Sequence, residues 1–150
     1  MYQVYREVLD HEFCDYIANI FRERFVYDPR GDWNAYTLKE KTLYDEILPK
    51  FSSVIPYPFK ANWINITEYK TGSSLRSHTD SNSSLTVVSE LTDGYEGGRF
   101  IINKDTYIKL NKGDVITFKG EEVTHGVEKV SKGVRLSLNL WTAPDTEHLI

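Results

Sequence analysis

Two histidines and one aspartate carry the strongest chemical signal in this sequence. His78 and Asp80 are two residues apart, so both side chains point to the same side of an extended chain. His125 follows later and precedes Gly126, which leaves room beside the imidazole. Two imidazoles and one carboxylate on one face bind Fe(II) and leave coordination positions open for oxygen chemistry. We therefore predict that His78, Asp80 and His125 form an iron site.

Two other readings of these residues stay open. A His-x-Asp triplet also occurs in solvated loops, and residues 77–84 could form one. A closed zinc site would normally add a cysteine or a further histidine. The remaining histidines, His11 and His148, lie near the two ends of the chain, and we expect both on the surface. The single cysteine, Cys14, is expected to be a small buried residue of a helix.

A predicted hairpin places Arg135 on the same side of the sheet as His125. Residues 131–133, Ser-Lys-Gly, fit a three-residue loop closed by a left-handed glycine, and this loop would pair Val130 with Val134. The same register places His125 opposite Asn139. Because side chains alternate along a strand, one face would then carry His125, Arg135, Ser137, Asn139 and Trp141.

The polar face of this hairpin has two interpretations. In the first, leucines 136, 138 and 140 form the core and the polar side chains face solvent. In the second, the leucines pack against helices that cover the sheet, and the polar side chains line a cavity inside it. The metal-site motif favours the second interpretation. Arg135 could then bind a carboxylate through two N–H groups, and Ser137 could add a hydroxyl.

The N-terminal third, about residues 10–55, is expected to supply two supporting helices. Asp10 has the side chain of an N-cap for a helix that runs to about Arg24. Thr37 would cap a second helix, whose end is disturbed by Pro49. Residues 27–36 between them are expected to form a loop.

Beyond Asn62 the pattern becomes that of short strands separated by glycine-containing turns. Seven or eight strands fit, and their spacing is typical of a jelly roll with the helices packed on its major sheet. We predict one domain over residues 1–150, mainly β, with its strand core at about residues 61–142.

Composition and charge restrict the partners. The chain has 150 residues, a net charge of −4 and no run of Lys or Arg, so we expect no nucleic-acid partner. No window approaches the roughly 20 apolar residues of a membrane span, and the N-terminus lacks the apolar stretch of a signal peptide. A cytoplasmic location is therefore expected, while the oligomeric state is not set by the sequence.

The order of the motifs adds a family resemblance. The segment from Trp63 to Trp141 resembles the catalytic core of prolyl 4-hydroxylase-like 2-oxoglutarate/Fe(II) dioxygenases. The matching motifs occur in the family's order: Tyr69-Lys70-Thr71-Gly72, His78-Thr79-Asp80, Leu85-Thr86-Val87-Val88, Gly97-Gly98-Arg99-Phe100, Lys112-Gly113-Asp114, Thr124-His125-Gly126-Val127 and Gly133-Val134-Arg135-Leu136-Ser137.

The resemblance implies a double-stranded β-helix that uses Fe(II), 2-oxoglutarate and O2 and releases succinate and CO2, with ascorbate as a candidate reductant. Arg135 would anchor the 5-carboxylate of 2-oxoglutarate, and Tyr69 and Ser137 would contact the same molecule. Two departures matter: many prolyl hydroxylases have Lys where Arg135 stands, and Ser89-Glu90-Leu91 replaces a family Tyr-Leu-Asn.

The substrate expected from this resemblance is a peptidyl proline, reached past Arg76 and Trp141. Three alternatives remain. The enzyme could hydroxylate a small molecule or a free amino acid, the chain could be a cupin-like metal-binding protein without oxygenase turnover, or it could be a non-catalytic jelly-roll binding module.

Overall fold

The computed structural model describes residues 1–24 and 34–145 of the chain. Its helices are α1 (His11–Arg24) and α2 (Lys41–Ile47), and a 3₁₀ helix, η1 (Leu48–Phe51), follows α2 directly. The strands are β1 (Tyr2–Tyr5), β2 (Asn34–Leu38), β3 (Phe59–Tyr69), β4 (Leu75–His78), β5 (Leu85–Glu90), β6 (Glu96–Gly97), β7 (Phe100–Ile102), β8 (Thr106–Ile108), β9 (Val115–Phe118), β10 (His125–Val127), β11 (Val130–Lys132) and β12 (Arg135–Pro144). From β3 onward the described chain has more strands than predicted, because several have only two or three residues.

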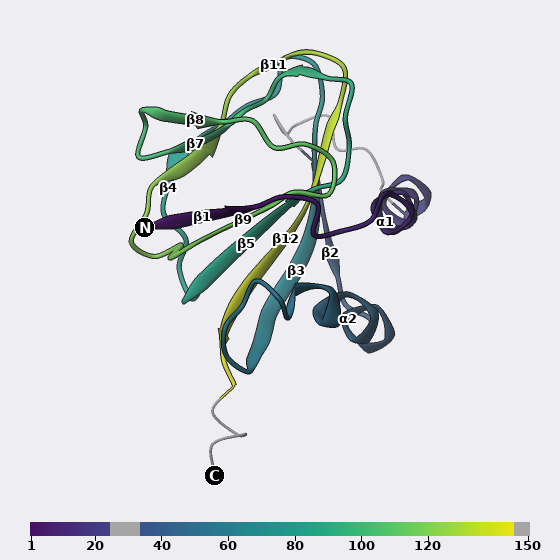
Figure 1. The fold of residues 1–150 in the computed structure, drawn as a ribbon. Helices are drawn as coiled ribbons and strands as arrows, with labels where there is room; N and C mark the ends of the chain where they lie inside the picture. The colour runs from purple at the N-terminus through teal and green to yellow at the C-terminus, as the bar shows by residue number, and fades with distance from the viewer. Residues whose placement is uncertain (25–33, 146–150) are drawn as a thin grey trace.

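The strands form a double-stranded β-helix, as predicted. A six-stranded antiparallel sheet has the order β1-β9-β5-β12-β3-β2, and a four-stranded sheet has the order β4-β10-β7-β8. Strands β11 and β6 form a separate two-stranded ribbon. Figure 1 shows α1 and α2 on one side of the larger sheet and the smaller sheet on its other side. The roll therefore has an inner space between two sheets and an outer face covered by helices.

Helix α1 begins at the predicted cap and buries one face against the larger sheet. The amide of Phe13 donates to Oδ1 of Asp10 over 2.8 Å, which satisfies one free N–H group of the first turn. Ile17 and Cys14 are fully buried in one cluster that also contains the outward side chains of β3 and β12. Those outward side chains are Ile64, Ile66, Leu136, Leu138 and Leu140. The leucine face of the last strand thus packs under the helices, which confirms the second interpretation of this strand.

The prediction for the second helix was wrong at its start. Thr37 does not cap it, because β2 includes this residue and pairs with β3, with Leu38 opposite Ile64. Helix α2 begins after Glu40, whose side chain makes no capping hydrogen bond. Of the loop predicted at residues 27–36, residues 34–36 belong to β2 and the others lie outside the described residues. Pairing along an open edge of β3 outweighed the local helix signal.

The predicted hairpin was also wrong. Strand β11 pairs with β6, not with β12, and β10 lies in the four-stranded sheet, where His125 pairs with His78 and Ile102. His125 is therefore not opposite Asn139, which pairs with Asn65 and Val88 in the larger sheet. His125 and the polar side chains of β12 nevertheless face the same inner space, because the two sheets enclose it from opposite sides.

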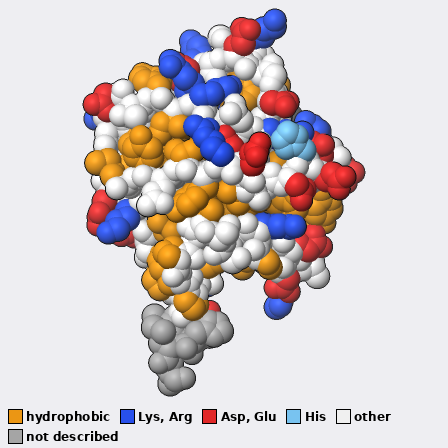
Figure 2. Space-filling model, in the orientation of Figure 1, with side chains coloured by type: hydrophobic (Ala, Val, Ile, Leu, Met, Phe, Trp, Pro, Cys, Tyr) orange, Lys and Arg blue, Asp and Glu red, His pale blue; other side chains and the backbone are white. Residues whose placement is uncertain are grey.

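The outer surface is mixed in charge. On the face shown in Figure 2, Lys and Arg side chains are interspersed with Asp and Glu and with hydrophobic patches. None of the helices within residues 1–24 and 34–145 is long and apolar enough to cross a membrane.

The approach of β4 to β10 depends on Gly126. A Cβ atom on this residue would lie 2.6 Å from the Leu75 carbonyl oxygen and 3.0 Å from the Ser77 amide nitrogen. Both are backbone atoms of β4, which also carries His78, so a side chain here would push that strand away.

We expect Gly126→Ala to lower the free energy of unfolding by about 1–3 kcal/mol, because the added methyl group overpacks a backbone contact. Urea denaturation measures the change. The control is Ser77→Ala, which keeps the Cβ atom already accommodated on β4 and should shift the midpoint little. Equal stability of Gly126→Ala and the wild type would contradict the close packing of these two strands.

Candidate metal centre

His78 and His125 face each other across neighbouring antiparallel strands. His78 ends β4 and His125 begins β10, and the register pairs their Cα atoms directly. Directly opposed residues of such a pair share one face of the sheet, so both imidazoles project to the same side. Their ring centroids are 4.4 Å apart.

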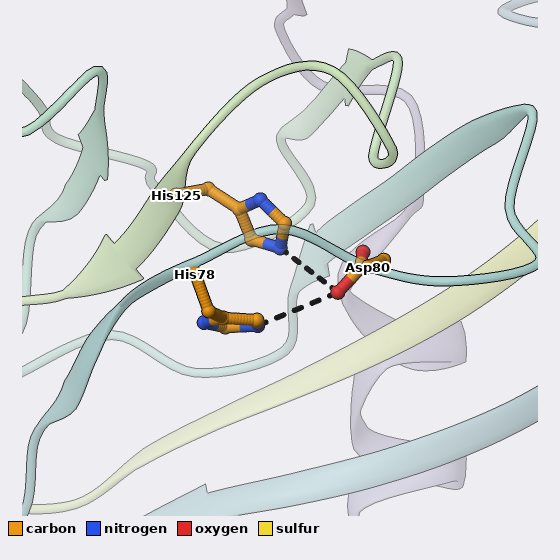
Figure 3. A group of neighbouring side chains, drawn as sticks. All are labelled: His78, Asp80 and His125. Atoms are coloured by element: carbon orange, nitrogen blue, oxygen red, sulfur yellow. Dashed lines mark hydrogen bonds and ion pairs between the residues drawn. The ribbon is translucent and has the colours of Figure 1, made fainter.

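Asp80 joins the two histidines from the segment after β4. Its Oδ1 lies 3.2 Å from Nε2 of His125 and 3.4 Å from Nε2 of His78, as the dashed lines in Figure 3 indicate. Its Oδ2 accepts a hydrogen bond of 2.9 Å from the Thr86 hydroxyl. One ligand atom from each of the three residues lies within 4.8 Å of the other two. The group can therefore offer two nitrogens and one oxygen to a single divalent ion.

Backbone carbonyls orient both imidazoles. Nδ1 of His78 lies 2.9 Å from the carbonyl oxygen of Arg76, and Nδ1 of His125 lies 2.9 Å from that of Val123. Since a carbonyl oxygen only accepts, each ring carries a proton on Nδ1, and Nε2 is the atom turned toward Asp80. Nε2 donates to this carboxylate when the ring is protonated and offers its lone pair to a metal ion when the ring is neutral. Metal-binding histidines are commonly held in this way.

The two imidazoles also control the charge of Asp80. Burial alone would raise the pKa of this carboxyl, but hydrogen bonds with His125 and His78 bring its pKa well below the ordinary value. In turn, the hydrogen bond with Asp80 raises the pKa of His78. Asp80 is therefore ionised at neutral pH, which is the form in which carboxylates bind metals.

The three residues line a pocket of about 120 Å³ between the two sheets. Tyr69, Arg135, Ser137 and Trp141 line the same pocket, so the structure brings these predicted residues together with the histidines and the aspartate. Arg76 is different: its side chain is exposed and does not line the pocket.

The remaining histidines lie elsewhere or cannot be placed. His11 is exposed at the start of α1, as predicted, and His148 lies outside the described residues. Cys14 is buried, also as predicted, and burial raises the pKa of its thiol to about 11.

Arg135 forms a buried ion pair beside the pocket. Its Nε donates to Oε2 of Glu90 over 2.8 Å, and the exposed fractions of the two side chains are 1% and 0%. Nη1 and Nη2 of Arg135 are buried and have no hydrogen-bond partner among the described residues. Buried N–H donors without a partner cost free energy, so they indicate a place for an acceptor. A carboxylate bound in the pocket would supply two acceptors to this guanidinium.

The sequence analysis did not predict the roles of two residues that contact the site, Glu90 and Thr86. Glu90 was noted only as a departure from a family motif, and Thr86 only as part of one. Alternation along β5 contains a signal for both, because Thr86, Val88 and Glu90 share the inner face and Glu90 is opposite Ser137. An acidic residue at an inward position of a buried strand predicts a cationic side chain close to it.

A family model describes most of the strand core. The model of the 2OG-Fe(II) oxygenase superfamily matches residues 64–143, which is more than half of the chain. The matched segment contains the three residues of the candidate metal centre, together with Glu90 and Arg135. No curated protein sequence gives a significant match.

Several solved structures have a similar fold. The viral collagen prolyl hydroxylase of Paramecium bursaria Chlorella virus-1, in its 2OG complex, superposes with a TM-score of 0.79 and 18% identity over 96% of each chain. A prolyl-4-hydroxylase of Pseudomonas putida gives 0.74 and 16% identity over 96% of this chain and 92% of its own. An alpha-ketoglutarate-dependent epimerase of nogalamycin biosynthesis gives 0.79 and 14% identity, over 97% of this chain and 78% of its own. At these identities the likeness concerns the fold.

We expect Thr86→Val to weaken the binding of a divalent metal about 10- to 100-fold, because the hydroxyl that holds Oδ2 of Asp80 is lost while the shape is kept. Titration calorimetry with Ni(II), which does not oxidise in air, measures the affinity. The matched control is Thr142→Val, since Thr142 is equally buried but donates to the Leu85 carbonyl oxygen. Unchanged Ni(II) affinity in Thr86→Val would mean either that Asp80 does not bind the metal or that the hydrogen bond from Thr86 does not contribute to this binding.

Proposed function

Because this chain belongs to the 2OG-Fe(II) oxygenase superfamily, whose oxidoreductases use Fe(II), 2-oxoglutarate and O2, we propose that the pocket between its sheets is the oxygenase active site. His78, Asp80 and His125 would hold the Fe(II), and Arg135 would bind the distal carboxylate of 2-oxoglutarate. One observation carries the proposal: the three potential ligands share their pocket with a buried guanidinium whose Nη1 and Nη2 have no partner in residues 1–24 and 34–145.

The residues present fit both groups. Two neutral imidazoles and one carboxylate are the donor set that suits Fe(II) in oxygenases and leaves coordination positions free. The unpartnered Nη1 and Nη2 of Arg135 suit a carboxylate, which can accept two parallel hydrogen bonds. When bound there, Fe(II) supplies the oxidative decarboxylation of 2-oxoglutarate to succinate and CO2 that is coupled to hydroxylation of a substrate.

Tyr69 and Ser137 would complete the binding of 2-oxoglutarate. Tyr69 is buried beside Arg135, with the guanidinium carbon 5.3 Å from its ring centroid. Burial raises the pKa of Tyr69 to about 12, so its hydroxyl keeps its proton and can donate. Ser137 offers a second hydroxyl from β12, next to Arg135 on the same face. Val88, Phe100 and Val127 also line the pocket and would limit the access of water.

For the substrate we propose a peptidyl proline. Trp141 and Trp63 form a cross-strand pair on β12 and β3, with ring centroids 5.4 Å apart, and both are only partly buried. An indole surface at one end of the pocket can pack against an apolar ring such as that of proline. The likeness in fold to two prolyl hydroxylases also favours this substrate. Arg76, which is exposed and lies outside the pocket, would contact the peptide only at the surface.

A small-molecule substrate is the second candidate. The epimerase of nogalamycin biosynthesis shares the fold, and the enclosed volume of about 120 Å³ is small, so a peptide would have to bind at the entrance of the pocket. A panel of proline-containing peptides, free amino acids and nucleotides, screened by mass spectrometry for products heavier by one oxygen atom, distinguishes these classes.

We expect the purified protein to form succinate only when Fe(II), 2-oxoglutarate and O2 are all present, and His125→Ala to abolish this activity because one of three metal ligands is lost. Succinate is measured by chromatography. His11→Ala, which removes an exposed histidine of α1, is the control and should retain full activity. Metal binding by the wild type without succinate formation would instead indicate a cupin-like binding protein, and activity in His125→Ala would refute the proposed metal site.

We expect a proline-containing peptide to gain one oxygen atom, and Trp141→Ala to lower kcat/KM for this peptide about tenfold, because the apolar surface beside the pocket is lost. The amount of succinate formed per hydroxylated product should rise, because more turnovers of 2-oxoglutarate would occur without hydroxylation of a loosely held peptide. Tyr16→Ala, which removes an exposed aromatic residue from α1, is the control. Arg76→Ala tests the surface contact separately. Normal kinetics in Trp141→Ala would place the substrate elsewhere.

A further inference from the structure

Glu90 occupies an unusual place for a carboxylate, at the inner side of the larger sheet. It is the last residue of β5 and pairs directly with Ser137 of β12, which lines the pocket. Its side chain is fully buried. Oε2 accepts hydrogen bonds from Nε of Arg135 at 2.8 Å and from the Tyr95 hydroxyl at 2.9 Å, and Oε1 lies 3.4 Å from the Thr92 hydroxyl.

The manner of this pairing differs from that of an exposed salt bridge in the same chain. Glu128 and Arg99, at the surface, pair through two nitrogens, with Nε and Nη2 each bonded to a separate carboxylate oxygen. Glu90 contacts Arg135 through Nε alone and leaves Nη1 and Nη2 without a partner in the part of the chain that the structure describes. The guanidinium is thus held from one edge, while its two terminal nitrogens remain available to a ligand.

The charges of Glu90 and Arg135 also affect how a carboxylate ligand would bind beside them. Burial alone would lower the pKa of Arg135, but the carboxylate of Glu90 raises it above the ordinary value, so Glu90 compensates the buried positive charge. Burial raises the pKa of Glu90, and Arg135 opposes that rise. A second carboxylate bound at Nη1 and Nη2 would share one positive charge with Glu90, and two carboxylates so close disfavour each other.

We propose that Glu90 is an internal counter-ion of the co-substrate site: it positions Arg135 and compensates its charge without ligand, and it weakens the binding of the distal carboxylate of 2-oxoglutarate. This inference rests on the proposed function. The group it concerns is the carboxylate that a 2-oxo diacid carries and a 2-oxo monoacid lacks. Glu90 is therefore a positioning residue that also sets the affinity for this part of the ligand.

The test compares Glu90→Gln with the wild type, and Glu128→Gln serves as the matched control at the exposed pair. Gln keeps an oxygen that can accept from Arg135 and Tyr95 but removes the charge. We expect Glu90→Gln to melt at a lower temperature without ligand, because a buried guanidinium loses its counter-ion. We also expect Ni(II)-loaded Glu90→Gln to bind 2-oxoglutarate about tenfold more tightly in calorimetry, because the repulsion between carboxylates is gone. Glu128→Gln should change neither value.

Binding of a second ligand distinguishes the effect of removing the Glu90 charge from the effect of general structural damage. 2-Oxobutyrate keeps the 2-oxo acid end but has no distal carboxylate, so its affinity should not increase in Glu90→Gln. Equal or weaker 2-oxoglutarate binding in Glu90→Gln, or an equal gain for both ligands, would overturn the counter-ion role. If the variant does not fold alone, refolding with Ni(II) and 2-oxoglutarate should recover it, and failure to recover it would also overturn the role. Absence of 2-oxoglutarate binding in the wild type would instead refute the proposed function.

Discussion

The burial of an apolar outer face on the larger sheet is the constraint on which the rest of this structure depends. In most two-layer β-structures the apolar side chains fill the space between the sheets. Here the leucines of β12 and the isoleucines of β3 point outward, where α1 and α2 cover them. One hydrophobic core of this sheet therefore lies under the helices, while a second, which includes Val88, Ile116 and Phe118, packs against the smaller sheet beside the polar side chains of β12. The inner face is then free to carry polar side chains, which a fully apolar interior would not accommodate.

The polar interior has its own requirements, because each buried polar group needs a partner. Asn139 donates to Asn65 and Thr67 across the β12–β3 pair, and Thr86 donates to Asp80. Backbone carbonyls bind Nδ1 of both histidines. By contrast, Nη1 and Nη2 of Arg135 are buried donors that have no acceptor among the described residues. The pocket is thus completed by protein groups almost everywhere except where a metal ion and a carboxylate would bind.

The two ends of the pocket are built on different sheets, and this division has a functional consequence. The histidines belong to β4 and β10 of the smaller sheet, while Tyr69, Arg135 and Glu90 belong to β3, β12 and β5 of the larger one. The distance between the two histidines and Arg135 is therefore set by how the sheets pack. Close contacts such as that of Gly126 with the backbone of β4 fix the smaller sheet internally. Strands hold the residues at both ends of the site, except Asp80, which lies in the segment after β4.

The amino-acid sequence by itself determined the class of fold, the capped first helix and the residues of the candidate metal centre, because these depend on residue types and on short-range periodicity. It also indicated that Arg135 and His125 face the same space, but for a reason that was wrong: the two residues lie on facing sheets and not in one hairpin. The actual arrangement follows from strand pairing, which joins segments that are far apart in the chain. The pairing of β2 with the edge of β3, which makes residues 34–38 a strand, is a second example. The contact of Glu90 with Arg135 likewise spans 45 residues, so only the tertiary structure could bring the two charges together.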